Sequence, residues 1–213
     1  MIKIIVGQKG EDTRATNQDN AAPGGGGGTY VWKSSDNTLL IAAGGGGGGG
    51  RSTHAGIHAN STTDGNDAYE VDNGGTGGNG ATTNSGGQSY WAGGGAGWLS
   101  DGTGGNQTTN YVYSGGSRGA EGGRKPLNGG VGGTRYNDGR DEGGDGGFGG
   151  GGGGGSDNMG TGGGGGYSGG GANWGWQNKS GGGGGSYNGG SSQTNTAGSG
   201  DGNTGHGKVV ITW

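Results

Sequence analysis

Glycine dominates this sequence: 73 of the 213 residues are glycine, and only 2 are proline. Glycine has no side chain to bury, and it loses more backbone entropy on folding than any other residue. Leucine, isoleucine, valine and phenylalanine together supply 18 residues, far below the roughly 20% of the chain that packed domains contain. A conventional hydrophobic core is therefore excluded, and an ordinary globular enzyme with it.

The spacing of the glycines predicts what replaces such a core. Residues 73–79, 128–134 and 142–148 each place a residue with a side chain at every third position, and three residues per turn is the period of a polyproline-II-type helix. Such a helix makes no internal hydrogen bonds, so its amide and carbonyl groups must find partners on neighbouring chains. We expect a bundle of polyglycine-II helices with connecting loops over about 44–205, with the third-position side chains facing outward.

Apolar residues gather in short runs that are typical of β-strands. The expected strands span about 2–7, 29–33, 38–43 and 208–213, and Tyr111–Tyr113 is a weaker candidate. The turn-forming residues Ser34–Asn37 predict that 29–43 is a hairpin. No segment repeats apolar residues at helical spacing. The predicted fold is a single all-β plus polyglycine-II domain, residues 1–213, with essentially no α-helix.

The net charge and the length of the apolar runs argue against binding to nucleic acid and against insertion into a membrane. Lysine and arginine number 12 against 16 aspartate and glutamate, a net charge of −4, so a footprint for nucleic acid is not expected. The longest apolar run, 39–43, is far too short to insert into a membrane. Cysteine is absent, which excludes disulfides and thiolate metal sites. Residues 1–6 do not form a recognisable signal peptide.

The non-glycine residues that interrupt the glycine runs carry a family resemblance. The chain resembles the glycine-rich extracellular domain of the anaplastic lymphoma kinase and leukocyte tyrosine kinase receptors over nearly its whole length, and its 181–190 stretch is more similar to bacterial members. The matching stretches are Val6–Asp12, Gly24–Trp32, Leu39–Gly47, Gly95–Trp98, Gly146–Phe148, Gly162–Tyr167 and Gly205–Ile211.

The resemblance implies a β-sandwich, similar to tumour necrosis factor folds, interlocked with a hexagonal bundle of glycine helices. It also implies an extracellular or cell-surface location and a polypeptide ligand. The chain departs from the receptors because it has no cysteine, no membrane span and no kinase domain, so receptor activity is not implied. The resemblance assigns no ligand-contact residue to a position of this chain. By composition alone, the chain is also similar to the tail-tip adhesins of T-even-like phages, which would place it on a virion.

Titratable side chains give no catalytic, cofactor or metal assignment. His54 and His58 lie four residues apart, but Gly56 separates them and no helix is expected there, so they are interpreted as loop residues. His206 receives no chemical role. An acidic group surrounding Arg140 is interpreted as a solvated loop, with a calcium site as the alternative. The acidic residues are Asp138, Asp141, Glu142 and Asp145.

Tryptophan and tyrosine are the strongest candidates for recognition. Trp174 and Trp176 would share one face of an extended chain, and Tyr167 and Tyr187 complete the predicted ligand-binding set. Trp91 and Trp98 are further candidates for stacking. The alternative is structural, in which aromatic residues seal the glycine bundle against the sandwich.

Three functions are compatible with these features. The first is a non-enzymatic extracellular scaffold that recognises a protein or glycan, or adheres, through its loops. The second is a structural or self-assembling surface or virion protein whose terminal strands pair with a neighbour. The third is ice binding, which the irregular loops disfavour.

Overall fold

The computed structural model describes residues 1–13, 22–50, 55–83, 92–104, 119–137, 142–155, 160–173, 179–198 and 205–212. Over these residues the chain forms one antiparallel sheet and one short 3-10 helix, η1 (Pro126–Asn128), and no α-helix. The strands β1 (Ile2–Ile5), β2 (Thr29–Lys33), β3 (Leu39–Ala43) and β4 (Tyr187–Asn188) lie in the order β1-β2-β3-β4. The predicted all-β character without α-helix is confirmed for the described residues.

Strands β2 and β3 form the predicted hairpin. Lys33 N–H donates to the Thr38 carbonyl at 2.9 Å to close the loop. Within the loop, Asp36 Oδ1 accepts the Thr38 N–H at 3.0 Å, and this bond lowers the pKa of Asp36. Asn37 adopts a left-handed conformation with φ of 56°, which asparagine tolerates better than most residues. The turn chemistry of the sequence therefore specifies the connection.

The first strand ends before its predicted boundary at residue 7. A Cβ on Gly7 would lie 2.2 Å from the Gly27 carbonyl oxygen, and Gly7 N–H donates to Thr29 Oγ1 at 2.9 Å instead of to a sheet ladder. Beyond Ile5 the chain thus leaves the sheet and enters the glycine-rich layer. The short strand β4, which pairs with Ile41 and Ala42, was not predicted.

The predicted C-terminal strand is wrong over residues 208–212, which form no strand, and residue 213 lies outside the described part of the chain. The run Val209–Thr212 is β-branched, but β propensity takes effect only where a partner strand is available. Among the described residues, no ladder reaches this segment. The Tyr111–Tyr113 candidate lies outside the described residues.

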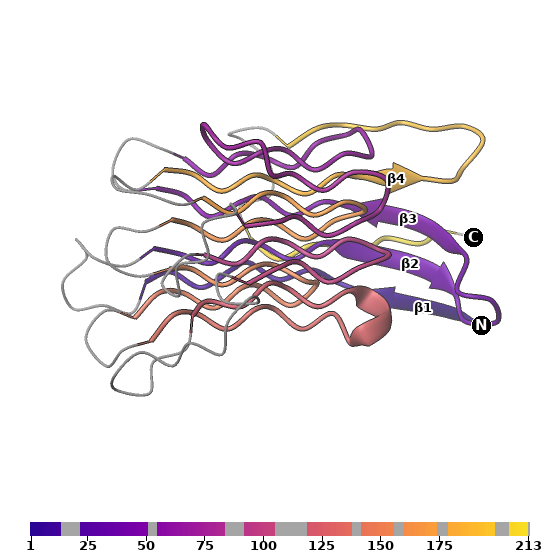
Figure 1. The fold of residues 1–213 in the computed structure, drawn as a ribbon. Helices are drawn as coiled ribbons and strands as arrows, with labels where there is room; N and C mark the ends of the chain where they lie inside the picture. Colours follow the sequence, from indigo (N-terminus) through magenta and orange to yellow (C-terminus); the bar gives the residue numbers. More distant parts are fainter. Residues whose placement is uncertain are drawn as a thin grey trace.

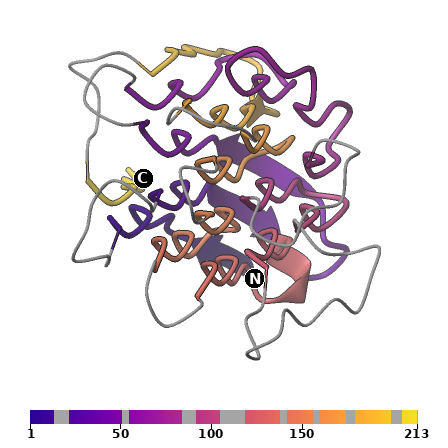
Figure 2. The same cartoon turned by 60° about the vertical axis from the view of Figure 1, so that its left-hand side comes forward.

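The glycine-rich segments run side by side along the length of the molecule, with the sheet at one end (Figure 1). Seen more nearly along their length, they stack in several rows and do not form a single sheet (Figure 2). Segments far apart in the sequence are neighbours: Gly25 N–H donates to Gly152 at 2.9 Å, and Gly165 N–H donates to Gly26 at 2.9 Å. Main-chain hydrogen bonds between distant segments therefore connect the whole body.

The segment 160–167 is surrounded on all sides by such bonds. Its amides donate in three directions, and each direction repeats every three residues. The donor and acceptor pairs, at 2.8–3.1 Å, are Gly162 to Pro23, Gly165 to Gly26, Gly163 to Gly93, Gly166 to Ala96, Gly164 to Gly182 and Tyr167 to Gly185.

Its carbonyls accept in three further directions with the same period. These pairs, donor first and at 2.7–3.2 Å, are Gly45 to Gly165, Gly48 to Gly162, Gly152 to Gly163, Gly155 to Gly160, Gly170 to Gly164 and Asn173 to Thr161. Six neighbouring segments thus satisfy one segment, whereas a β-strand bonds to two neighbours.

Glycine occupies most of the interior of this network, and the few buried polar side chains there include Thr161, Ser168 and Asn173. The backbone of 149–155 and of 160–166 is buried throughout. A Cβ added to Gly163 would lie 1.9 Å from the Gly170 carbonyl oxygen, and one added to Gly152 would lie 1.9 Å from that of Gly93. Real Cβ atoms do not approach backbone oxygens so closely, so glycine is required there by the neighbouring chains.

The expectation that every third residue faces outward holds for part of the chain. Val131, Thr134 and Asn137 are exposed. Asn73 differs, because it is only 5% exposed. Its side-chain amide donates to the Ala172 and Thr82 carbonyls at 2.6 and 2.9 Å, and its Oδ1 accepts the Ala68 N–H at 3.2 Å. A polar side chain here takes the place of a neighbouring main chain.

A small aromatic core joins the sheet to the glycine-rich body. Trp98 packs against Tyr30, with ring centroids 6.2 Å apart, and edge-on against Trp32 at 5.8 Å. The Tyr30 hydroxyl donates to the Gly166 carbonyl at 3.1 Å and also lies 3.4 Å from the Gly149 carbonyl oxygen. Tyr30 therefore spans the boundary, with its ring in the core and its hydroxyl on the glycine segments.

We predict that Gly163→Ala destabilises the protein by at least about 3 kcal/mol, because its methyl group would collide with a fixed carbonyl. The matched control is Gly46→Ala, where the nearest atom to an added Cβ is 3.9 Å away; it should change stability by no more than about 1 kcal/mol. Urea unfolding measures both. Equal effects of the two substitutions would contradict the packing described here.

Burial raises the pKa of Tyr30 well above its ordinary value. The unfolded chain releases this proton near pH 10 while the folded chain retains it, so its contribution to stability is complete below about pH 10 and is lost as the pH rises further. We predict that wild type loses up to about 1.4 kcal/mol per pH unit more than Tyr30→Phe above about pH 10. Unfolding curves of both proteins between about pH 8 and 11 test this, and parallel pH profiles would refute it.

Candidate functional site

Two of the four predicted ligand-binding aromatics, Tyr167 and Tyr187, lie in the described part of the chain. Their rings stack with centroids 5.1 Å apart and planes inclined by 22°. Tyr187 is the first residue of β4. Tyr167 is the last residue of segment 160–167, and its backbone N–H donates to the Gly185 carbonyl at 2.8 Å. Both are partly buried against the aromatic core, so the sheet and the glycine body together fix their positions. Trp174 and Trp176 lie outside the described residues.

Leu99 extends the surface formed by the two tyrosines. A Cβ on Gly78 would lie 3.1 Å from Leu99 Cγ and 3.4 Å from Tyr167 Cζ, so both side chains border the same glycine. Leu99 is 54% exposed, and no atom lies within 4 Å of a Cβ placed on the adjacent Gly77. We call Leu99, Tyr167 and Tyr187 the aromatic patch. Sequence reasoning missed Leu99, although it follows Trp98 in an interruption of the glycine pattern.

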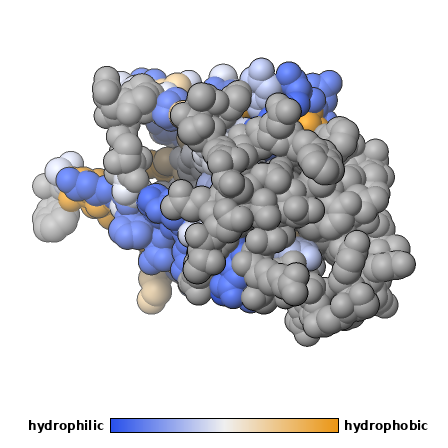
Figure 3. Space-filling view, turned by 90° about the vertical axis from the view of Figure 1, so that its left-hand side faces the viewer, coloured by the Kyte–Doolittle hydropathy of each residue, from blue (hydrophilic) through white to orange (hydrophobic). Residues whose placement is uncertain are grey.

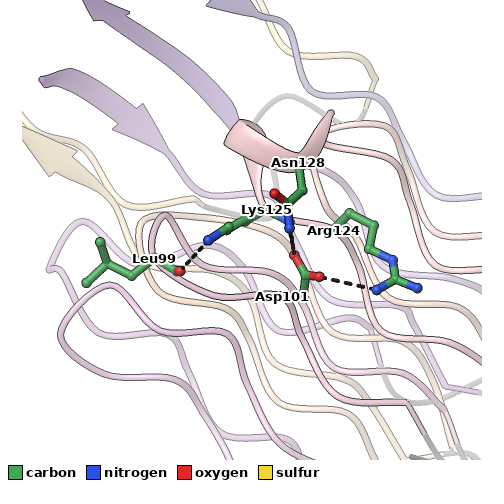
Figure 4. A network of polar contacts seen from close by, with 5 residues as sticks. All are labelled: Leu99, Asp101, Arg124, Lys125 and Asn128. Carbon is green, nitrogen blue, oxygen red and sulfur yellow. Dashed lines mark hydrogen bonds and ion pairs between the residues drawn. The ribbon is translucent and has the colours of Figure 1, made fainter. Parts of the chain in front are cut away.

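Asp101 anchors the loop that carries Leu99 (Figure 4). Asp101 Oδ1 accepts the Lys125 backbone N–H at 2.8 Å, and Oδ2 lies 3.2 Å from Arg124 Nη1. Lys125 Nζ in turn donates to the Leu99 carbonyl at 3.0 Å, and Asn128 Nδ2 lies 3.4 Å from Asp101 Oδ1. These contacts join the 98–101 loop to the segment that enters η1, so the position of Leu99 is set by a network of charged groups.

Trp98 serves the core and not the exposed surface. Its side chain is buried between Tyr30 and Trp32, and its backbone N–H donates to the Tyr167 backbone carbonyl at 2.8 Å. The structural alternative offered for the aromatics therefore applies to Trp98. Trp91, the other candidate for stacking, lies outside the described residues.

Two carboxylates of the acidic group hold an arginine that the sequence did not single out. Asp145 Oδ2 lies 2.8 Å from Arg135 Nη1, and Glu142 Oε2 lies 3.2 Å from Arg135 Nη2. Asp145 Oδ1 also accepts the Arg135 backbone N–H at 2.8 Å. Because these oxygens bind a guanidinium, they tie the 131–137 and 142–147 segments together.

The other ionisable candidates contribute no assembled site in the described ranges. Asp138, Arg140, Asp141 and His54 lie outside those ranges. His206 Nδ1 accepts the Lys9 N–H at 3.3 Å, which is a structural contact. Within the described part of the chain, no three histidine, aspartate or glutamate side chains are arranged to hold a metal ion.

No protein-family model matches this chain, and no curated protein matches it significantly. None of the described segments forms a helix long and apolar enough to cross a bilayer. Viewed from the end of the molecule away from the sheet, the described residues on the surface are mainly hydrophilic (Figure 3).

We predict that Asp101→Ala destabilises the protein by about 1–2 kcal/mol, because the partly buried Lys125 N–H loses its acceptor and Arg124 loses its partner. The control is Asp12→Ala, which removes an exposed ion pair with Lys9 and should cost well under about 1 kcal/mol. Urea unfolding at low and high salt distinguishes them. The network would have no structural role if both variants unfolded at the same urea concentration.

Proposed function

We propose that this chain is a non-enzymatic, extracellular or surface-displayed scaffold that recognises a polypeptide or a glycan through its loops and aromatic patch. The observation that carries the proposal is the hydrogen bonding of segment 160–167 to six neighbouring segments. When main-chain hydrogen bonds hold the body together, most of the larger side chains are placed at the surface and at the ends of the segments. Rigid presentation of a few aromatic groups is what a recognition surface requires.

We further propose that the glycine segments are polyglycine-II helices in a hexagonal bundle. The support is the three-residue repeat in the direction of their hydrogen bonds, since a helix with three residues per turn returns each amide to the same side every third residue. The six bonded neighbours of segment 160–167 are the number expected for hexagonal packing. This arrangement agrees with the glycine-rich receptor domains that the sequence resembles.

The expected β-sandwich is also a proposal. The inner face of the sheet carries Ile5, Tyr30 and Ala42, which are buried, whereas Ile4 and Ile41 on the outer face are partly exposed. An apolar outer face favours a second layer that covers it. The same face favours the alternative of a self-assembling surface or virion protein.

The aromatic patch has the chemistry to bind a sugar ring or a side chain. Tyrosine offers an apolar ring and a hydroxyl at little entropic cost, and aromatic side chains dominate the binding energy of many interfaces. The described carboxylates Asp101, Glu142 and Asp145 are each paired with arginine. These three carboxylates therefore have structural roles.

The proposal is tested by screening the protein against glycan arrays and displayed peptides, then titrating any ligand by calorimetry. We expect Leu99→Ala, and separately Trp174→Ala combined with Trp176→Ala, to weaken binding by roughly tenfold or more without unfolding the protein. Val131→Ala is the control, because Val131 is as exposed as Leu99 but lies outside the aromatic patch.

Near-UV circular dichroism and the melting temperature verify that each variant is folded. If wild type binds no member of either library, or if all the variants bind as tightly as wild type, the recognition role is wrong.

A further inference from the structure

Asparagine followed directly by glycine is the pair most prone to spontaneous deamidation, because glycine has no side chain to hinder the reaction. The sequence contains four such pairs, which begin at Asn73, Asn79, Asn128 and Asn188, and all lie in the described part of the chain. In this reaction the backbone nitrogen of the glycine attacks the side-chain carbonyl carbon of the asparagine. The glycine must leave its hydrogen bond and turn toward the side chain, so the reaction requires a local opening of the fold.

Three of the four glycines are held by groups seven or more residues away in the sequence. The donor and acceptor pairs are Gly74 N–H to Asp67 Oδ1 at 2.7 Å, Gly80 N–H to Ser100 Oγ at 2.9 Å and Gly189 N–H to the Leu40 carbonyl at 2.9 Å. A Cβ added to any of these glycines would lie 2.3–3.2 Å from a backbone oxygen. These three glycines therefore have little room to turn while the protein is folded.

The fourth pair, Asn128 and Gly129, is exposed at the end of η1. Gly129 N–H donates to the Pro126 carbonyl at 3.1 Å within the same short turn, so opening of this turn alone releases it. The nearest atom to a Cβ added to Gly129 is 3.8 Å away, which leaves the glycine room to turn.

The side chain of Asn128 is also held more weakly than the other three. Its Nδ2 lies 3.4 Å from Asp101 Oδ1, whereas the side-chain amides of Asn73, Asn79 and Asn188 donate at 2.6–3.1 Å. Both halves of the reacting pair are thus least restrained at this position.

We propose that Asn128 is a site of spontaneous deamidation, and that it is the pair among the four that reacts in the folded protein. The Gly129 nitrogen bonds to Asn128 Cγ, the bond from Cγ to the side-chain nitrogen breaks, and ammonia leaves with the proton of the Gly129 amide. Water then opens the succinimide ring at either carbonyl, which leaves an aspartate or an isoaspartate at position 128.

The reaction alters the network that anchors Leu99 (Figure 4). Asp101, which faces the Asn128 amide, accepts the Lys125 backbone N–H, and Lys125 Nζ donates to the Leu99 carbonyl. A carboxylate at position 128 has no proton to donate to Asp101 and repels it. Isoaspartate also adds a methylene group to the main chain before Gly129, which distorts the end of η1. The modified protein therefore holds the loop of Leu99 less firmly, whether or not this loop binds a ligand.

Ageing the folded protein at mildly alkaline pH, followed by peptide mapping with tandem mass spectrometry, tests the proposal. We expect the acid form to accumulate at Asn128 at least about tenfold faster than at Asn73, Asn79 or Asn188. In guanidinium chloride the four rates should converge, because the difference comes from the fold. The proposal is overturned if Asn128 reacts no faster than the other three in the folded protein, or if the same ranking persists in the unfolded chain.

The consequence for the Leu99 network is tested with Asn128→Gln, because glutamine would have to form a larger ring and reacts far more slowly. Aged wild type should unfold at a lower urea concentration than fresh wild type, whereas aged and fresh Asn128→Gln should unfold alike. Asn79→Gln is the matched control and should age as wild type does. If wild type modified at position 128 unfolds at the same urea concentration as the fresh protein, the proposed effect on the network is wrong.

Discussion

The lateral hydrogen bond between main chains that carry no side chains is the interaction on which this structure depends. Each such bond contributes only about 1 kcal/mol net, but segment 160–167 makes them toward six neighbours. A buried amide without a partner costs more than a satisfied one gains. Hydrogen bonding of the buried backbone by neighbouring segments therefore takes the place that apolar packing holds in ordinary domains.

The apolar residues have a different role from that of a conventional core. Tyr30, Trp32 and Trp98 form one small cluster at the end of the glycine segments, where the sheet meets the body. Tyr30 connects the two parts, because its hydroxyl binds carbonyls of the glycine segments. The sheet thus closes one end of the glycine-rich body and positions the aromatic patch through β4 and Tyr187.

Sequence reasoning succeeded where the signal was local. The hairpin followed from Ser34–Asn37, and the outward positions of Val131 and Thr134 followed from the three-residue spacing. It failed where neighbours decide the outcome: 208–212 has strand propensity without a partner, β4 is too short to give a pattern, and Asn73 is buried because its amide replaces a missing segment. The pairing of Arg135 with Asp145 and the anchoring of Leu99 by Asp101 also depend on contacts that no local pattern reveals.

Many partners of the glycine segments come from distant parts of the chain. Residues 22–28 bond to segments near residues 8–11, 46, 149–155 and 162–165. Such a network has a high contact order, and loops must close before any of these bonds forms. Because each described segment also needs neighbours from distant parts of the chain, we expect the body to assemble cooperatively and slowly.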